Sequence, residues 1–120
     1  MKAIIKKYHS PDILDLENYM PNDREYFSYL LQILVGPDLL NGEESFDIQI
    51  CSPKWINDNY SKEDVILGRH MIIQKEYNFS RIKSFLINYI DNINGAKWEE
   101  IALKISRIGK WEFEDYKGQV

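Results

Sequence analysis

The segment Tyr26–Val35 constrains the fold more than any other part of this sequence. Every odd-numbered position in it is apolar, whereas the even-numbered positions mix apolar and polar side chains. The apolar set is Phe27, Tyr29, Leu31, Ile33 and Val35. Successive side chains of a strand point to opposite faces, so this pattern is typical of a strand with one fully buried face. We therefore expect the central strand of a sheet that helices cover on one side.

A second strand is expected at Ser45–Ser52, where apolar and polar residues again alternate. The turn-forming pairs Gly36-Pro37 and Asn41-Gly42 lie between the two strands, so we expect an antiparallel hairpin. Its loop carries two acidic residues, which are Glu43 and Glu44.

Two shorter segments complete the predicted sheet. Lys2–Tyr8 is typical of an edge strand, because its lysines discourage pairing with another chain. Leu67–Glu76 contains a strand centred on Met71–Ile73.

Helix signals follow the strands. Ser52 and Pro53 are a cap and a first helical residue, and they predict a short helix over Pro53–Tyr60. Asn78 begins a longer helix whose apolar stripe includes Phe85 and which we expect to end at Asn94-Gly95. A last helix starts near Trp98 and is expected to close at Gly109. We predict an α+β fold: a mostly antiparallel sheet of about four strands, with helices packed on one face and two of them C-terminal.

Composition limits the class of protein. The chain has 120 residues, 44% of them hydrophobic and 28% charged, which predicts one domain over residues 1–120. No apolar stretch approaches the roughly 20 residues that cross a bilayer, and the N-terminus lacks a signal-peptide core. A lone cysteine, Cys51, in an apolar strand pattern suits a reducing compartment. These features predict a cytoplasmic protein with no membrane contact.

The net charge is −4. It argues against nucleic acid as a partner, because such binding needs a basic surface. An acidic balance suits a basic protein partner, and it equally suits a small domain that simply stays in solution.

No catalytic, cofactor or metal site emerges from the sequence. The chain lacks a glycine-rich phosphate loop, a zinc-ligand spacing and a nucleophile elbow. The acidic trio Asp12, Asp15 and Glu17 does not match a calcium loop. One alternative is left open, namely a small enzyme or ligand-binding domain that uses Arg69 and His70 beside a carboxylate.

The segment after the last helix alternates aromatic and acidic residues from Trp111 to Tyr116. Three aromatic rings are costly to leave in water, so this tail is expected to dock on its own domain or on a partner. We favour Trp111 and Phe113 pointing inward and the acids outward. The tryptophan on the last helix is expected in the core, while Trp55 and Trp111 suit either core or interface.

Six segments, in order and over nearly the whole chain, resemble the Immunity protein 8 family of bacterial polymorphic toxin systems. They are Lys6–Asp12, Asp23–Ser28, Gly42–Trp55, Gly68–His70, Trp98–Ile101 and Ser106–Tyr116. The most specific parts are Glu44–Asp47, Cys51–Trp55 and the terminal run Gly109–Phe113.

The resemblance implies a protein that binds and neutralises a toxin made by its own cell and its kin, with no catalytic residues. The expected partner is a cognate toxin domain of a polymorphic or contact-dependent system, with a basic nuclease as a narrower possibility. Candidate toxin contacts are Glu43, Glu44, Asp47, Trp55, Glu112, Glu114 and Asp115. Two alternatives stay open: an adaptor or structural domain unrelated to toxins, and a homodimer formed through the edge strand.

Overall fold

The central strand of the sheet is β2, Ser28–Pro37, in the computed structural model, which describes residues 1–114. β1 (Ala3–His9) and β3 (Glu44–Cys51) pair with it antiparallel on its two sides. The expected central strand and hairpin are therefore confirmed. β2 starts two residues later than predicted and continues through Gly36-Pro37, because both residues still pair with β1.

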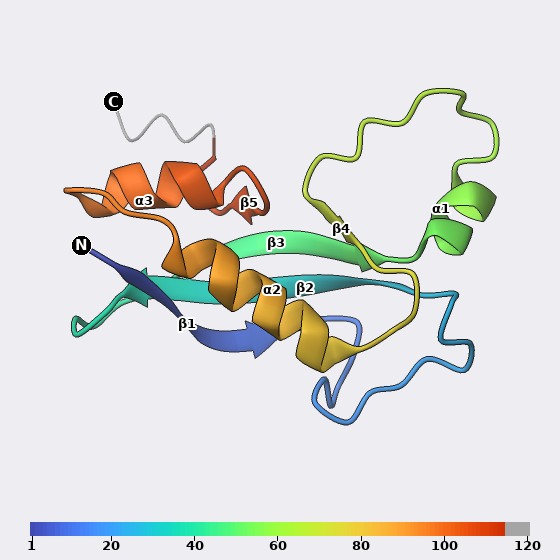
Figure 1. Ribbon diagram of the computed structural model, residues 1–120, viewed down its shortest axis with the longest axis horizontal. Coiled ribbons are helices and arrows are strands. Elements are labelled where there is room, and N and C mark those ends of the chain that lie inside the picture. The colour runs from blue at the N-terminus through green and yellow to red at the C-terminus, as the bar shows by residue number, and fades with distance from the viewer. Residues whose placement is uncertain (115–120) are drawn as a thin grey trace.

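The outer edge of β3 carries two short strands (Figure 1). β4 (Met71–Ile73) runs parallel to β3, and β5 (Lys110–Trp111) pairs antiparallel with its first half. The prediction of about four mostly antiparallel strands is thus wrong in part, since the sheet is mixed and has five strands. A crossover connection returns the chain in the direction of β3 and makes β4 parallel. β5 has only two residues, too few to show a strand period.

That crossover begins with α1 (Pro53–Asn59), which matches the predicted short helix. The Ser52 hydroxyl accepts a hydrogen bond from the Trp55 amide over 3.2 Å, as an N-cap does. The same hydroxyl accepts from the Phe27 amide, also over 3.2 Å. Ser52 is therefore fully buried and joins the start of α1 to the segment that leads into β2.

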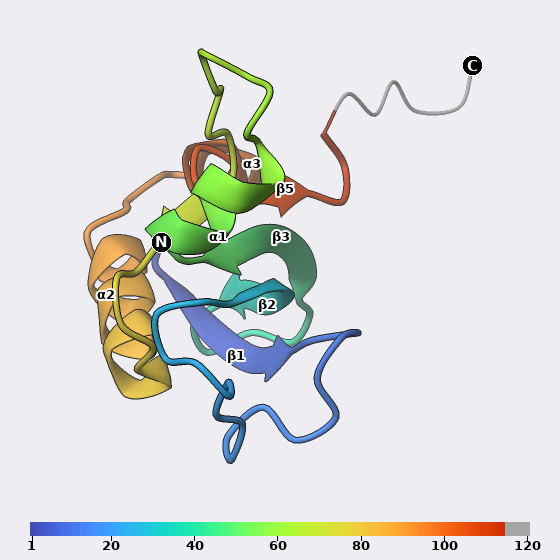
Figure 2. The ribbon, with the colours of Figure 1, turned by 90° about the vertical axis from the view of Figure 1, so that its right-hand side faces the viewer.

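Two further helices cover one face of the sheet. α2 (Phe79–Asp91) is capped by Asn78, as predicted, and α3 is Trp98–Ile105. Figure 2 shows α2 on one side of the strands and α3 above β3 and β5. The inward residues of both helices join those of the sheet in one apolar core. Its fully buried members include Leu31, Ile33, Phe46, Ile48, Ile50, Leu86, Ile90, Ile101 and Ile105.

Both helices end earlier than the sequence suggests. α2 stops at Asp91, and the C-cap of α3 is Ser106 rather than Gly109. Gly109 has another role, because a Cβ atom there would lie 3.0 Å from side-chain carbons of both Phe46 and Ile48. The missing side chain lets the C-terminal segment approach β3 closely. Phe85, expected in the apolar stripe of α2, is 53% exposed.

Candidate functional site

The C-terminal segment is attached to the start of β3. Phe46 pairs with Trp111, and Asp47 pairs with Lys110. Just beyond, the Glu112 amide donates to the Ser45 carbonyl over 3.1 Å, and the Ser45 amide donates to Oε1 of Glu112 over 2.8 Å. The expectation that the tail docks on its own domain therefore holds for residues 110–114.

Glu44 is at the centre of the packing between tail and domain. Its Oε1 atom accepts a hydrogen bond from the indole nitrogen of Trp98 over 2.7 Å and one from that of Trp111 over 2.9 Å. The two tryptophans come from α3 and β5, so one carboxylate oxygen joins three elements. Trp98 is half-buried rather than a full core residue.

A hollow of about 360 Å³ opens beside this carboxylate. We call it the tail pocket. Its lining consists of three aromatic and two acidic residues, which are Trp98, Trp111, Phe113, Glu44 and Glu99. Trp111 stacks on Phe46 with ring planes 12° apart, and Phe113 packs edge-on against Trp111. Phe113 was expected to point inward, but it is 38% exposed.

Glu114 joins the tail to the segment that precedes β4. Its Oε1 lies 3.1 Å from a terminal nitrogen of Arg69 and 3.8 Å from Nε2 of His70. The same His70 nitrogen lies 2.9 Å from the Ser106 carbonyl oxygen. The side chain of Glu114 is only 19% exposed, so it does not face outward as the sequence suggested. Its carboxylate lies between basic groups of its own chain.

The other two acids of this region differ in their surroundings. Asp47 is half-buried and accepts a hydrogen bond from the side-chain amide of Gln32 over 3.1 Å. Glu43 is exposed at the end of the hairpin loop. Five of the seven residues that sequence reasoning selected thus lie on the hairpin loop, on the first half of β3 or on the tail that pairs with it, with Glu44 and Asp47 on opposite faces of the strand. We call these five the tail surface: Glu43, Glu44, Asp47, Glu112 and Glu114.

Of the remaining two candidates, only Trp55 falls within the described residues. Trp55 is on α1, beyond the opposite end of β3 from Glu44. It is half-buried and packs edge-on against Tyr60. At about 3.3 Å per residue, the strand alone separates the two ends by roughly 23 Å. Asp115 lies outside the described residues.

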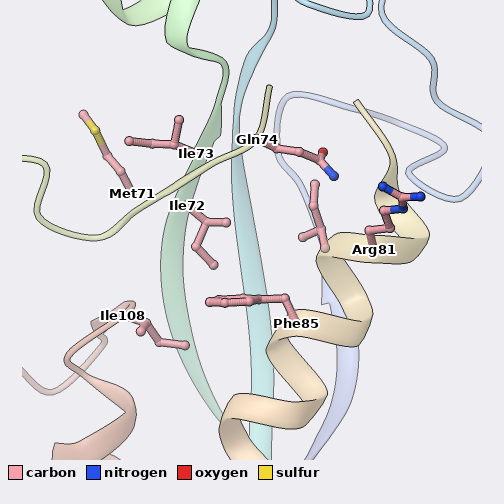
Figure 3. A pocket seen from close by; sticks show the side chains of 8 residues that line it. Met71, Ile72, Ile73, Gln74, Arg81, Phe85 and Ile108 are labelled. Atoms are coloured by element: carbon pink, nitrogen blue, oxygen red, sulfur yellow. The ribbon is translucent and has the colours of Figure 1, made fainter. Parts of the chain in front are cut away.

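An apolar groove of about 350 Å³ separates β4 from α2. Figure 3 shows Ile72 pointing toward Phe85 and Ile108, whereas Met71 and Ile73 point the other way. Arg81 lies at one end of the groove. Sequence reasoning missed this groove, because the exposed Phe85 fits the same helical period as its buried neighbours.

Sequence reasoning also missed an exposed apolar loop between α1 and β4. Val65 is 85% exposed and Leu67 is 86% exposed. The run Val65–Leu67 was a usable signal, since three consecutive apolar residues next to Gly68 are unusual in a solvated loop.

Catalytic chemistry finds little support in this arrangement. Among residues 1–114, no three His, Cys, Asp or Glu side chains gather closely enough to hold a metal ion. Arg69 and His70 do lie beside a carboxylate, but both hold Glu114. Cys51 is fully buried, and burial raises the pKa of its thiol to about 11. Its thiolate, which is the reactive form, is therefore scarce near neutral pH.

Within the described part of the chain, no helix combines the length and the apolar character needed to cross a bilayer.

Comparison with known proteins gives one match. No curated protein and no solved structure resembles the chain closely enough to count as similar. The family model described as Immunity protein 8 matches residues 3–116, which is nearly the full length. The matched range includes both the tail surface and the tail pocket. This chain belongs to the Immunity protein 8 family.

Proposed function

We propose that this chain is an immunity protein that binds the toxin domain of a bacterial polymorphic or contact-dependent toxin system and neutralises it in the cytoplasm. The observation that carries the proposal is the family match over residues 3–116. An immunity protein protects its own cell by blocking the toxin, so its chemistry is that of a binding surface.

The geometry of the tail surface supports this role. Its half-buried acids are held in place by hydrogen bonds and ion pairs from four different elements or segments. A preorganised surface loses little conformational entropy when a partner binds, and this favours affinity. The rings of Trp98 and Trp111 add the aromatic character that is common at the centre of interfaces.

Binding rather than catalysis also fits the way in which the reactive groups are used. His70 contacts a backbone carbonyl and Glu114. Cys51 is fully buried, and this burial raises the pKa of its thiol. His70 and Glu114 are thus engaged in structural contacts, and Cys51 is shielded by burial.

We propose that the tail surface is the main part of the protein that the toxin covers. A standard interface buries on the order of 800 Å² per partner, roughly 32 Å across if it is round. An interface of this width exceeds the length of β3, so a toxin domain that extends along the whole strand reaches Trp55 as well. Asp115, which follows the last described residue of the tail, is also proposed as a toxin contact.

A basic nuclease is a narrower proposal for the toxin. Acids of an inhibitor can occupy a cleft that normally binds phosphate. Here Glu43 and Glu112 are the exposed acids of the tail surface, whereas Glu114 is paired with Arg69. Binding of a basic toxin to these acids weakens as salt rises, because exposed charges are screened.

The homodimer also remains a proposal, and it rests only on β1 lying at the edge of the sheet. The pairing of β1 with β2 shifts register between Ile5 and Lys7. Such an irregularity blunts an edge against pairing with another chain. Light scattering of the isolated protein gives its mass and decides between one copy and two.

The proposed function is tested by mixing the purified chain with the toxin domain encoded beside its gene. We expect a stable complex by size-exclusion chromatography and loss of toxin activity in step with the amount of complex. If the chain instead forms a stable complex with another host protein and ignores the toxin, the adaptor alternative is correct.

A further inference from the structure

We propose that the tail pocket receives a basic side chain, lysine or arginine, from the toxin. The inference rests on the proposed function and deepens it by naming the chemistry of one contact. Its starting point is the composition of the pocket, whose described lining has three aromatic rings and two carboxylates but no basic residue.

The charge of Glu44 is the first argument. Its carboxylate is half-buried, and within the described part of the chain its only hydrogen-bond donors are the two neutral indole groups of Trp98 and Trp111, both on Oε1. None of the ion pairs among residues 1–114 includes Glu44 or Glu99. Partial burial of a carboxylate is costly unless a cation compensates it. The pocket therefore has negative charge that no basic group among residues 1–114 compensates.

The contrast with Glu114 strengthens this argument. Both acids belong to the same surface, and both are shielded from water. Glu114 has Arg69 at 3.1 Å, so its charge is compensated within the chain. Glu44 has no such neighbour among the described residues. A cation from outside would give it the partner that Glu114 already has.

The aromatic walls are the second argument. The faces of tryptophan and phenylalanine rings attract cations, and tryptophan does so most strongly. Trp98, Trp111 and Phe113 surround one hollow, with Trp111 and Phe113 packed edge-to-face at 5.7 Å between centroids. Rings and carboxylates together suit an ammonium or guanidinium group on an apolar stem.

The size and position of the pocket are the third argument. Its volume of about 360 Å³ is ample for one long side chain. Exposed acids flank it, with Glu43 on the hairpin loop and Glu112 on the tail. Exposed acids at the rim of an interface speed the encounter with a basic partner. Buried aromatic and charged residues at the centre of the interface provide most of the affinity.

The test compares two variants of the full chain, Glu44→Gln and Glu63→Gln, in calorimetric titrations with the toxin domain encoded beside the gene. The first removes the charge in the pocket and keeps an oxygen that can accept both indole hydrogen bonds. The second removes an exposed charge from the loop after α1, far along the chain from the tail. We expect Glu44→Gln to raise the Kd about tenfold or more and Glu63→Gln to leave it unchanged, with both melting temperatures preserved.

A double-mutant cycle then identifies the toxin residue. Each lysine and arginine of the toxin is replaced by alanine and tested against both the wild-type chain and Glu44→Gln. We expect one toxin variant whose loss of affinity largely disappears in the Glu44→Gln background. If Glu44→Gln keeps the wild-type Kd, or if no basic residue is coupled to it, the inference is wrong while the proposed function stands. If the wild-type chain does not bind the toxin, both are wrong.

Discussion

The indole nitrogen of Trp111 donates a hydrogen bond to Oε1 of Glu44 over 2.9 Å, and this contact ties the last strand to the first residue of β3. The same ring stacks on the fully buried Phe46. Trp111 therefore packs against the core and also forms a wall of the tail pocket. The sequence left core and interface as alternatives for Trp111. Its stacking on Phe46 supports packing against the core, and its place in the wall of the tail pocket keeps the interface role open.

Replacing this ring should separate packing from hydrogen bonding. We expect Trp111→Ala to lower the free energy of unfolding by about 2–3 kcal/mol, because a half-buried ring is lost against Phe46. Trp111→Phe keeps a ring but loses the N–H donor, so a loss of about 1 kcal/mol is expected. Urea denaturation measures both. Equal losses for the two variants would show that the stacked ring contributes nothing.

Gly109 should be sensitive to the smallest added side chain. An alanine Cβ would lie 3.0 Å from carbons of Phe46 and Ile48, so we expect Gly109→Ala to cost about 1–3 kcal/mol. Gly68→Ala is the matched control, because its Cβ would meet only the Met71 sulfur at an ordinary 3.7 Å. Thermal melts compare the two. A Gly109→Ala melt no lower than that of the control would contradict the close approach of tail and β3.

Tyr8 and Tyr29 should respond oppositely to loss of their hydroxyl groups. The Tyr8 hydroxyl oxygen is buried without a hydrogen-bond partner among the described residues. The Tyr29 hydroxyl lies 2.9 Å from that of Tyr77. We expect Tyr8→Phe to be neutral or stabilising by up to about 1 kcal/mol, and Tyr29→Phe to destabilise by about 1 kcal/mol or more. Chemical denaturation measures the free energy of unfolding of both variants. A Tyr8→Phe variant that loses more stability than Tyr29→Phe would disprove this account.

Cys51 should be unreactive in the folded protein. Burial raises the pKa of its thiol from 9.0 to about 11, so the folded state holds the proton more tightly than the unfolded state. The stability this provides is complete below about pH 9 and is lost as the pH rises toward 11. At pH 8 we expect iodoacetamide to leave the native protein unlabelled while the urea-unfolded chain reacts fully, as intact mass shows. Equal rates in the two states would rule out this burial.

The long periodic elements were predictable because each shows its period several times. The alternation in β2 and the caps at Ser52 and Asn78 located a central strand and two helix starts. Phe85 shows the limit of such patterns. It keeps the helical period of α2 but lines the groove beside β4 and is exposed, because no element formed by residues 1–114 covers that side.

The parts that the sequence could not predict are those set by tertiary contacts. The parallel direction of β4 depends on the path of the crossover, and the two residues of β5 pair only because Gly109 lets them approach β3. The acids of the tail were expected to face outward as a group; Glu112 is exposed, whereas Glu114 pairs with Arg69. Glu44, expected on the hairpin loop, instead accepts hydrogen bonds from two tryptophans distant in sequence. Long-range partners of this kind leave no local signal.

The central claim is that this member of the Immunity protein 8 family protects a cell by binding its toxin. Its most direct test is the survival of bacteria that express the toxin domain encoded beside the gene, with and without this chain. We predict that cells producing the wild-type chain survive at near-normal numbers, while cells with the toxin alone die. Equal killing in both cultures, with the chain present and folded, would contradict the account.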